Sequence, residues 1–592
     1  MASGSHAGNR DVTDMLRELA ELTMLEEGDP QSFRVRAYET AIHAIDAETR
    51  DITKLTPAEL QKIDGIGKST AAKIRELVEK GSVEKLEGLR AKHPRSIVAL
   101  LQIQGLGPKA IAKLRAEHGI TGLEDLERIL SEQKLRVMKG FGVKTEEKLA
   151  KAVERFKKSG GDKRTPISVA LPLAERIVDE LRPVPGVVFA GYCGSLRRFS
   201  ETIGDLDIVV ATHDPGPVME AVMALRVVAN VLAQGDTKAS FLTPRGMQVD
   251  VRVIAPEQLG AAMMYFTGSK GHNIKLRQRA IERGLILNEY ALEETATKRI
   301  VARETEEEIY AALDLPWIHP AMREDAGEIE LAEKGRLPTP IDPRAIVADL
   351  HVHTSLSGDG RSELDEIVRT ARARGYKYLA ITEHAEKLSM NGVGREALLE
   401  QRKKMAAIQR EVAGDMKLLH GIELNIGPAG ELDYDPEFRA AFDYCLASVH
   451  DHFDQDQAAQ TQRIITAMRD PSVRMIGHLS ARMIGGRPPI ELDIDAVLAA
   501  AEETGTALEV NGSLPRLDIS VDVLRRARGR AVPLVITSDA HKSDELAYVE
   551  YGCLNVTRAG VSSEQVVNAW SGDKFGAWAA EKRPLPAIGS SP

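Results

Sequence analysis

The chain has few of the features that mark secreted and membrane proteins. No apolar run approaches the ~18 residues that a membrane-spanning helix needs, and the first ten residues lack the hydrophobic segment of a secretory signal. The three cysteines, Cys193, Cys445 and Cys553, lie far apart and form neither a disulfide framework nor a CxxC zinc motif. We therefore expect a protein of the reducing cytoplasm.

Aromatic residues are also scarce, at 4% of the 592 residues, but the composition is otherwise ordinary. Hydrophobic residues make up 43% and charged residues 28%, which is typical of folded soluble domains and excludes a disordered or fibrous chain. At roughly 100–200 residues per domain, this length predicts three to five domains.

Charge is distributed unevenly along the sequence. The whole chain carries a net charge of −10, yet residues 1–160 carry +3 and the remainder carries −13. A mildly basic segment on an acidic protein predicts a local site for a polyanion rather than a general coat of positive charge. Histidine is skewed as well, because eight of the fifteen histidines follow residue 347.

Residues 11–158 have apolar positions three and four apart, which predicts helices without strands. A glycine-x-glycine motif recurs there three times, as IDGIGK at 63–68, IQGLGPK at 103–109 and MKGFGVK at 138–144. One copy is compatible with a plain glycine-capped turn, but three favour turns whose backbone N–H groups and lysines hold phosphate. They resemble helix-hairpin-helix motifs, which bind the DNA backbone without reading bases. The candidate DNA contacts are Gly65, Gly67, Lys68, Gly105, Gly107 and Lys109.

From about residue 165 helices mix with short strands, and the motif GSLRRFSETIGDLDIVV at 194–210 stands out. On a strand, Asp205 and Asp207 point to the same face, and Asp250 of the alternating run QVDVRV adds a third carboxylate. Such carboxylates repel one another, and two hard divalent ions, Mg²⁺ or Mn²⁺, relieve the repulsion. The pattern predicts a two-metal, in-line phosphoryl transfer.

The same motif offers groups for a nucleoside triphosphate. Gly194 and Ser195 supply backbone N–H groups and a hydroxyl at a strand-to-helix turn, and Arg198 supplies positive charge. A lone DxD is more often a surface feature. GS-x-RR followed by Gly204 and DxD, with a later strand aspartate, is instead a nucleotidyltransferase signature. This signature alone also fits enzymes that add nucleotides without a template.

After the proline-rich run EKGRLPTPIDPRA, seven strand-like runs alternate with helical stretches. This predicts a parallel α/β barrel or sheet whose site lies at the C-terminal ends of the strands. One histidine after a strand is more often structural, but six of the seven runs end in His, Asp or Glu, which indicates a metal cluster. The candidate ligands are His351, His353, His384, Glu423, His450, His478, Asp539 and His541.

Mixed imidazole and carboxylate ligands favour Mn²⁺, Zn²⁺ or iron over Mg²⁺. The groups suffice for two or three ions, with Glu423 as a plausible bridge. Arg482, four residues beyond His478, is a candidate phosphate ligand. His420 and His452 fall outside the pattern, and we interpret both as structural or as supporting the ligands.

Residues 11–320 resemble the family X DNA polymerases. FRVRAYETAIHAI and IDGIGKSTAAKI match the small lyase domain of this family. The resemblance implies that Lys73 is the Schiff-base lysine that opens a 5′-deoxyribose phosphate. Arg34 and Ser69 stand where DNA polymerase beta has lysines, so a phosphate contact by Lys73 remains the alternative.

The run YFTGS and the residues after it resemble the family X thumb. The resemblance implies that Tyr265 and Phe266 lie against the incoming sugar and help exclude a ribose 2′-hydroxyl, with Gly268 following them. It also implies that Asn273 contacts the base in the minor groove and that Arg277 contacts the templating strand. The alternative is that the two aromatic residues belong to the core.

The C-terminal runs resemble the PHP domain, named for polymerase and histidinol phosphatase, which is a distorted seven-stranded barrel. HVHTSLSGDG matches its first motif, except that Gly358 adds a residue before Asp359, which joins the candidate ligands on this resemblance. Fused to a polymerase, such a domain implies a Mn²⁺-dependent 3′→5′ exonuclease, with abasic-site processing as an extension. The family also hydrolyses small phosphomonoesters.

We therefore expect a family X DNA polymerase that fills short gaps in base excision repair or end joining. The alternatives are a template-independent nucleotidyltransferase fused to a PHP phosphoesterase, and a DNA-binding scaffold with inactive catalytic domains, against which the intact aspartates and histidines argue. Expected partners are gapped or nicked DNA and dNTPs, for a monomer associated with the nucleoid.

The expected fold is an all-α helix-hairpin-helix region, an α+β nucleotidyltransferase palm and thumb, and a distorted (β/α)7 PHP barrel. The expected domains are a lyase-like domain at 11–86, fingers at 87–160, a palm at 161–262, a thumb at 263–335, a linker at 336–346 and a PHP domain at 347–592.

Overall fold

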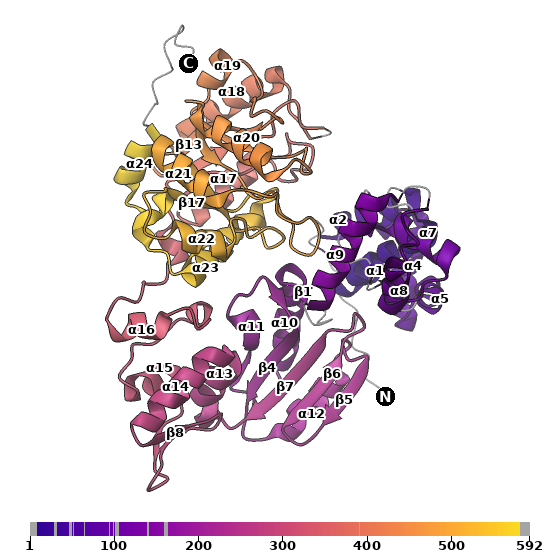
Figure 1. Cartoon of the computed structure of the whole chain (residues 1–592), viewed down its shortest axis with the longest axis vertical. Coiled ribbons are helices and arrows are strands. Elements are labelled where there is room, and N and C mark those ends of the chain that lie inside the picture. Colours follow the sequence, from indigo (N-terminus) through magenta and orange to yellow (C-terminus); the bar gives the residue numbers. More distant parts are fainter. Residues whose placement is uncertain are drawn as a thin grey trace. The chain divides into compact units, whose positions relative to one another are not determined.

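The computed structural model of the chain is drawn in Figure 1. It describes residues 9–580 apart from 29–31, 47–49, 51, 64, 94, 99, 101, 102, 104, 105, 139, 140, 159–163 and 390. The chain forms two compact units, residues 1–162 and 163–592, and the palm, thumb and PHP domain share the second. Over the described residues, none of the helices combines the length and the apolar character needed to cross a membrane.

The described part of the first unit is all-helical, as the sequence predicts. α1 packs against α2, α5 and α7 around one apolar core. α4 begins directly after Gly67, whose backbone is extended, and ends at Gly81, whose positive φ of 73° suits glycine. The helices are α1 (Asn9–Glu27), α2 (Phe33–Asp46), α3 (Pro57–Leu60), α4 (Lys68–Lys80), α5 (Glu84–Lys92), α6 (Arg95–Val98), α7 (Pro108–His118), α8 (Leu123–Ser131) and α9 (Val143–Lys158).

The palm is built on a five-stranded sheet of order β2-β4-β7-β6-β5. The two central strands, β4 and β7, are parallel and bury their alternate apolar side chains, so the polar residues between them reach the opposite face. The strands are β2 (Phe189–Tyr192), β4 (Asp205–Ala211), β5 (Asn230–Gln234), β6 (Lys238–Leu242) and β7 (Gln248–Ile254), and a two-stranded ribbon joins β1 (Thr165–Pro166) to β3 (Thr202–Ile203). The helices are α10 (Ile167–Leu181), α11 (Gly194–Arg197) and α12 (Pro215–Ala224).

The thumb combines helices with a three-stranded antiparallel sheet. Its core contains a buried ion pair, in which Arg323 donates to both oxygens of Glu306. The helices are α13 (Leu259–Thr267), α14 (Lys270–Glu282), α15 (Glu306–Ala312) and α16 (Glu328–Glu333). The strands are β8 (Leu285–Leu287), β9 (Leu292–Glu294) and β10 (Ile300–Ala302).

The PHP domain is a parallel seven-stranded sheet whose strands follow one another in sequence order. A parallel bridge between Val352 and Ala540, just beyond the first and last strands, brings its two edges together as a nearly closed barrel. The strands are β11 (Ala348–Asp349), β12 (Tyr378–Ile381), β13 (Lys417–Asn425), β14 (Tyr444–Ser448), β15 (Val473–Ile476), β16 (Ala507–Asn511) and β17 (Leu534–Thr537). The helices are α17 (Leu364–Ala373), α18 (Arg395–Val412), α19 (Pro436–Ala440), α20 (Gln457–Arg469), α21 (Ile494–Thr504), α22 (Val521–Ala527), α23 (Val549–Ala559) and α24 (Gly572–Ala580). These elements confirm the predicted fold class.

The barrel interior is packed at its N-terminal end. One residue or more from each strand forms an apolar layer, against which Phe575 of α24 is fully buried. The layer includes Ala380, Leu419, Leu446 and Val535. Because strand side chains alternate, the residues four places further along these strands also face inward, at the C-terminal mouth.

The palm and the PHP domain share an apolar core. Leu514 and Leu517, from the segment after β16, are buried in the cluster formed by the palm helices and strands. The ring of Phe199 in the palm stacks on Tyr551 of α23, with 5.8 Å between centroids. The two domains are therefore held by packed side chains rather than by a linker alone.

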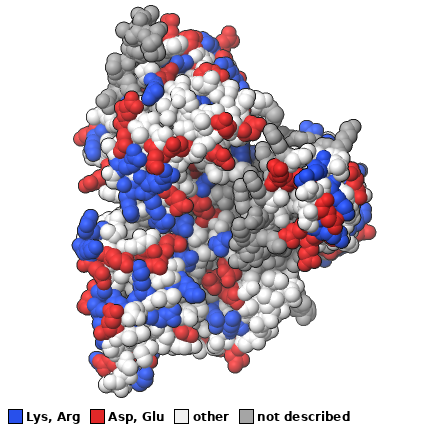
Figure 2. All heavy atoms as spheres, viewed as in Figure 1, with Lys and Arg blue, Asp and Glu red and all other residues white. Residues whose placement is uncertain are grey.

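Charges of both signs are interspersed over the face drawn in Figure 2. Basic side chains gather over α22 and the turn that follows it. Arg526 pairs with Asp495 at 2.6 Å, and Arg530 pairs with Glu502 at 2.7 Å. Acidic neighbours thus offset part of this basic patch.

Candidate active sites

The three predicted palm aspartates meet on one face of the sheet. Asp205, Asp207 and Asp250 each offer an oxygen within 4.8 Å of the others, because β4 and β7 run parallel with Asp207 beside Asp250. Burial, together with the negative charges of Asp205 and Asp250, raises the pKa of Asp207 to about 7. Such mutual repulsion is the environment that divalent cations relieve, and all the donors are the hard oxygen atoms that Mg²⁺ and Mn²⁺ prefer.

Neighbouring residues orient Asp250. Gln248 donates an amide N–H to Asp250 Oδ2 at 2.8 Å, and the hydroxyl of Ser240 donates to Asp250 Oδ1. Gly204 is half-buried and directly precedes β4, so it places Asp205 at the first position of that strand.

Gly194 and Arg198 both lie near Asp207 of this carboxylate group. Gly194 has a φ of 61°, and a Cβ there would lie 2.2 Å from Asp207 Oδ2, so only glycine fits. α11 starts at Gly194 and includes Ser195. Arg198 donates from Nη1 to the carbonyl of Thr267 at 2.6 Å, and its charge partly counters the rise in the pKa of Asp207.

The predicted thumb residues cluster at the end of α13. Asn273 donates to the carbonyl of Tyr265 at 2.7 Å, and Arg277 donates to the carbonyl of Asn273 at 3.3 Å. Tyr265, Asn273 and Arg277 line one pocket with Leu287 and neighbouring residues. Phe266 meets the Tyr265 ring edge-on at 5.1 Å and the Arg252 guanidinium at 5.3 Å. Gly268 has a φ of 68° and ends the helix.

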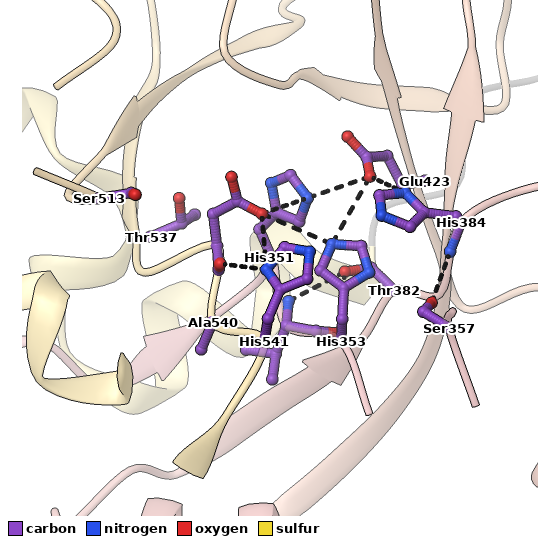
Figure 3. A network of polar contacts seen from close by, with 12 residues as sticks. His351, His353, Ser357, Thr382, His384, Glu423, Ser513, Thr537, Ala540 and His541 are labelled. Carbon is purple, nitrogen blue, oxygen red and sulfur yellow. Dashed lines mark hydrogen bonds and ion pairs between the residues drawn. The ribbon is translucent and has the colours of Figure 1, made fainter. Parts of the chain in front are cut away.

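The histidines and acids of the PHP barrel converge in overlapping groups, and Figure 3 labels His351, His353, His384, His541 and Glu423 among them. Glu423 is central: its Oε2 lies 2.8 Å from His384 Nδ1 and 3.4 Å from His351 Nε2, and its Oε1 lies 3.0 Å from His478 Nε2 and 3.3 Å from His450 Nε2. The overlapping candidate metal groups are His353/His384/His541, His351/Glu423/His478, His351/His353/Asp539 and His384/Glu423/His450.

The structure places Asp359 in the same cluster despite the additional Gly358. Its Oδ2 lies 3.3 Å from His384 Nε2 and 3.5 Å from His541 Nε2. Burial alone would raise the pKa of Asp359, but the two histidines outweigh it and lower that pKa. All nine predicted PHP side chains therefore come together.

Several polar atoms in this cluster are buried without a hydrogen bond among the described residues. They are His351 Nε2, both ring nitrogens of His353, His384 Nδ1, Glu423 Oε2, His478 Nδ1 and Asp359 Oδ1. Such atoms are costly to bury unless something binds them. A mixed imidazole and carboxylate set fits Mn²⁺, Zn²⁺ or iron.

Two residues at the end of β16 support the cluster and were missed in the sequence. Glu509 accepts a hydrogen bond from His351 Nδ1 at 2.6 Å, and Asn511 donates to Asp539 Oδ2 at 3.0 Å. The run TALEVNG was the one strand end to which no ligand was assigned. A glutamate inside an otherwise apolar strand was the signal that could have found Glu509.

Arg482 does not point a free guanidinium into the cluster, so the prediction of a phosphate contact there is wrong. It donates to both oxygens of Glu201 in the palm at 2.8 and 3.0 Å, and also to the carbonyls of Arg516 and Leu517. Arg516 is the arginine beside the metal cluster, with its Nε 3.3 Å from Asp539 Oδ2.

The two remaining histidines lie outside the cluster, as expected. His420 stacks on Phe442 at 4.9 Å and accepts from Arg402. His452 is exposed, with its Nδ1 2.9 Å from Asp451 Oδ1. Neither histidine belongs to the groups of described residues that could hold a metal ion.

In the first unit, Lys73 lies one helical turn from the start of α4. Its Nζ donates to Ser69 Oγ at 2.7 Å and lies 5.7 Å from the centre of the Tyr38 ring. Burial lowers the pKa of Lys73, and Lys85 lowers it further. Arg34 pairs with Glu27 at 3.0 Å.

The described helix-hairpin-helix turns have the expected glycine geometry. Gly65 has a φ of 91°, and a Cβ there would meet Thr40 at 3.0 Å, whereas Gly67 and Gly107 face open space directly before α4 and α7. Lys68 and Lys109 are exposed at the starts of these helices. Gly105, like Gly140 of the third copy, lies outside the described residues.

Sequence models of four families match separate parts of the chain. They are a helix-hairpin-helix domain at 7–83, a SAM-like helix-hairpin-helix tandem at 97–155, the DNA polymerase beta thumb at 262–324 and the PHP domain at 349–513. Over 572 residues the chain is 35% identical to the DNA polymerase/3′-5′ exonuclease PolX of Bacillus subtilis (strain 168), which covers 95% of this chain and 97% of that protein. The chain belongs to the family X DNA polymerases that carry a PHP domain.

This family X polymerase also has relatives that match only part of the chain. It is 30% identical over 233 residues to a probable phosphatase of Thermoanaerobacter sp. (strain X514), which covers 38% of this chain and 90% of that protein. It is 29% identical over 248 residues to a probable phosphatase of Acetivibrio thermocellus, which covers 40% of this chain and 96% of that protein. About two fifths of this chain therefore covers almost the whole of each of these relatives.

Proposed function

We propose that this protein is a DNA-directed DNA polymerase with a 3′→5′ exonuclease in its PHP domain. The observation that carries the proposal is that the chain has two separate groups of side chains that could bind divalent metal ions. One group consists of three aspartates, and the other consists of histidines and acids. Its substrates are gapped or nicked DNA and dNTPs, in base excision repair or end joining. We further propose a monomer that works at the nucleoid, with the domain limits given above.

In the palm, Asp205, Asp207 and Asp250 hold two ions, Mg²⁺ or Mn²⁺. When bound, these ions supply the Lewis acidity that an in-line attack by the primer 3′-hydroxyl on the α-phosphate requires. Gly194, Ser195 and Arg198 hold the β- and γ-phosphates, with Gly204 setting the start of the strand. Tyr265, Phe266 and Gly268 lie against the sugar, Asn273 contacts the base and Arg277 contacts the template strand.

In the PHP domain, nine side chains hold two or three ions, Mn²⁺ or Zn²⁺, which supply Lewis acidity for hydrolysis of the 3′-terminal phosphodiester. We assign the phosphate contact to Arg516. Its Nη1 is buried without a hydrogen bond among the described residues, while its Nε faces Asp539. A guanidinium that keeps one unpaired N–H group beside a metal cluster can donate a hydrogen bond to a phosphodiester oxygen.

The test uses a labelled primer on a duplex with a one-nucleotide gap. Template-matched addition with dNTPs, and 3′ shortening with Mn²⁺ alone, support the proposal. Addition without shortening would leave the barrel as a scaffold or as a small-molecule phosphatase. The relatives named probable phosphatases favour the phosphatase as the second candidate. Untemplated addition favours the alternative of a template-independent nucleotidyltransferase.

Paired variants separate the two sites. Asp205→Ala with Asp207→Ala abolishes dNTP addition and spares 3′ shortening, whereas His351→Ala with His353→Ala does the reverse. The parent's far-UV circular dichroism spectrum is the control for folding. Loss of both activities from either folded pair contradicts the two-site assignment.

We propose in addition that Lys73 is a lyase nucleophile. The support is its lowered pKa beside Tyr38, because a less basic amine is neutral more often and attacks a sugar aldehyde. Borohydride should trap the chain on a 5′-deoxyribose phosphate end, and Lys73→Ala should abolish the adduct. A persisting adduct would leave Lys73 as a phosphate contact.

A further inference from the structure

One carboxylate in the second unit contacts arginines of both catalytic domains. Glu324 follows the 3₁₀ turn η4 (Pro320–Met322), which packs against α23 of the PHP domain. Its Oε1 lies 3.0 Å from Nε of Arg198 in the palm and 3.4 Å from Nη2 of Arg558 in α23. A single oxygen is therefore shared between the proposed triphosphate ligand and the nuclease domain.

The contacts of Arg198 fix the plane of its guanidinium. Nε donates to Glu324, and Nη1 donates to the carbonyl of Thr267 at 2.6 Å. Because the group is planar and rigid, two such bonds from different nitrogens determine its orientation. Arg198 has five N–H donors in all, which leaves donors for phosphate oxygens. Its side chain is 15% exposed, so the remaining edge is reachable.

Arg558 determines how strongly Glu324 acts on Arg198. The side chains of Glu324 and Arg558 are 20% and 14% exposed, so solvent screens this group only in part. With Arg558 present, the Glu324 carboxylate is held in place and shares its charge between two cations. Without Arg558, Glu324 is free to move and its full charge acts on Arg198, in competition with the nucleotide phosphates.

We propose that Glu324 and Arg558 are positioning residues through which the PHP domain sets the affinity of the palm for the incoming dNTP. This proposal rests on the role given to Arg198 under the proposed function. Arg558 belongs to α23 and Glu324 to the thumb, so the contact makes nucleotide binding dependent on a domain that performs the opposite reaction. The nuclease cluster itself does not include either residue.

The experiment is single-nucleotide insertion into a one-nucleotide gap by the full-length chain. Arg558→Gln should raise the apparent KM for dNTP about fivefold, the scale of one lost ion pair that solvent partly screens, with kcat changed less than twofold. Arg558→Lys should restore most of the affinity. Arg374→Gln is the matched control. Arg374 pairs at 2.7 Å with Glu550, which belongs to α23 like Arg558, and this ion pair includes no palm residue.

Two further readouts exclude a merely structural effect. The rate of 3′ shortening should be the same in Arg558→Gln and the parent. In a Glu324→Ala background, Arg558→Gln should change KM less than twofold, because its effect passes through Glu324. A KM for Arg558→Gln equal to that of Arg374→Gln overturns the proposal. If Arg198→Gln leaves the KM for dNTP unchanged, the triphosphate contact assigned to Arg198 under the proposed function is wrong instead.

Discussion

At the scale of single residues, Glu509 shows how a side chain outside the candidate metal groups can order their members. It is fully buried and accepts hydrogen bonds from His351 Nδ1, from the backbone N–H of His478 and from the hydroxyl of Thr537. The first of these bonds places the proton of His351 on Nδ1, which leaves Nε2 facing Glu423 and Asp539. Glu509 thereby sets which nitrogen can act as a ligand.

We predict that Glu509→Gln lowers the rate of 3′ shortening about 10- to 100-fold. The amide keeps the shape of the side chain but loses the charge that favours this tautomer of His351. The measurement is Mn²⁺-dependent shortening of a labelled primer, and dNTP addition by the same preparation is the control. A variant that shortens primers at the parent's rate would rule out this role for Glu509.

The sequence was informative about ligands but not about their neighbours. His384, Glu423, His450 and Asp539 lie at or near the ends of strand-like runs, so the two-residue period of a strand predicts that they share the barrel interior. The partner of Arg482 could not be predicted in this way. Glu201 is far away in the sequence and meets Arg482 only because the two domains pack together.

At the scale of secondary-structure elements, a buried ion pair joins α11 to α15. Arg197 donates to both oxygens of Glu306, and Arg323 does the same from the other side. Burial alone would raise the pKa of Glu306, but the two arginines outweigh it and lower that pKa to about 2. The palm helix is thereby tied to the thumb.

This pKa predicts how the ion pair depends on pH. Because the folded pKa lies below the ordinary glutamate pKa of 4.5, the stabilisation is complete above about pH 4.5 and is lost as the pH falls toward 2. Glu306→Gln should destabilise the folded state by about 3 kcal/mol at pH 7, with a difference that narrows below pH 4.5. Trp317, which donates to Glu306 at 3.2 Å, reports unfolding by its fluorescence. If the difference in free energy of unfolding between the variant and the parent does not change with pH, the lowered pKa of Glu306 is contradicted.

The turn before α11 gives a second prediction at this scale. Gly194→Ala should lower dNTP addition about 100-fold, because the added Cβ would displace Asp207 by roughly an ångström. The control is Gly186→Ala, at another palm glycine with positive φ whose Cβ would meet Thr212 and not an aspartate. The comparison uses single-turnover insertion. Equal activities of the two variants would contradict the prediction.

At the scale of the whole molecule, the second unit behaves as one packed body. Leu514 and Leu517 of the PHP domain are buried in the palm core, and Arg482 pairs with Glu201 beside them. Alternating strands and helices predicted the separate folds. The contact could not be predicted, because Leu514 and Leu517, which are buried in it, belong to a segment without any regular period.

Removal of residues 336–592 should therefore destabilise the palm. Burial of each leucine contributes about 2 kcal/mol, so the truncated chain should unfold at a lower temperature than the parent. In the full-length chain, Leu517→Ala should lower the free energy of unfolding by about 3 kcal/mol. Far-UV circular dichroism during heating measures both. A truncated chain that retains the parent's unfolding temperature would show that the shared core adds no stability.

The closed N-terminal end of the PHP barrel limits how DNA can be degraded. Phe575 and the apolar layer above it close the barrel below the metal cluster, so a strand cannot thread through. The DNA end enters and the released nucleotide leaves by the same opening. After each cut the product has to escape past the strand that delivered it, which favours degradation in short, separate encounters over continuous digestion.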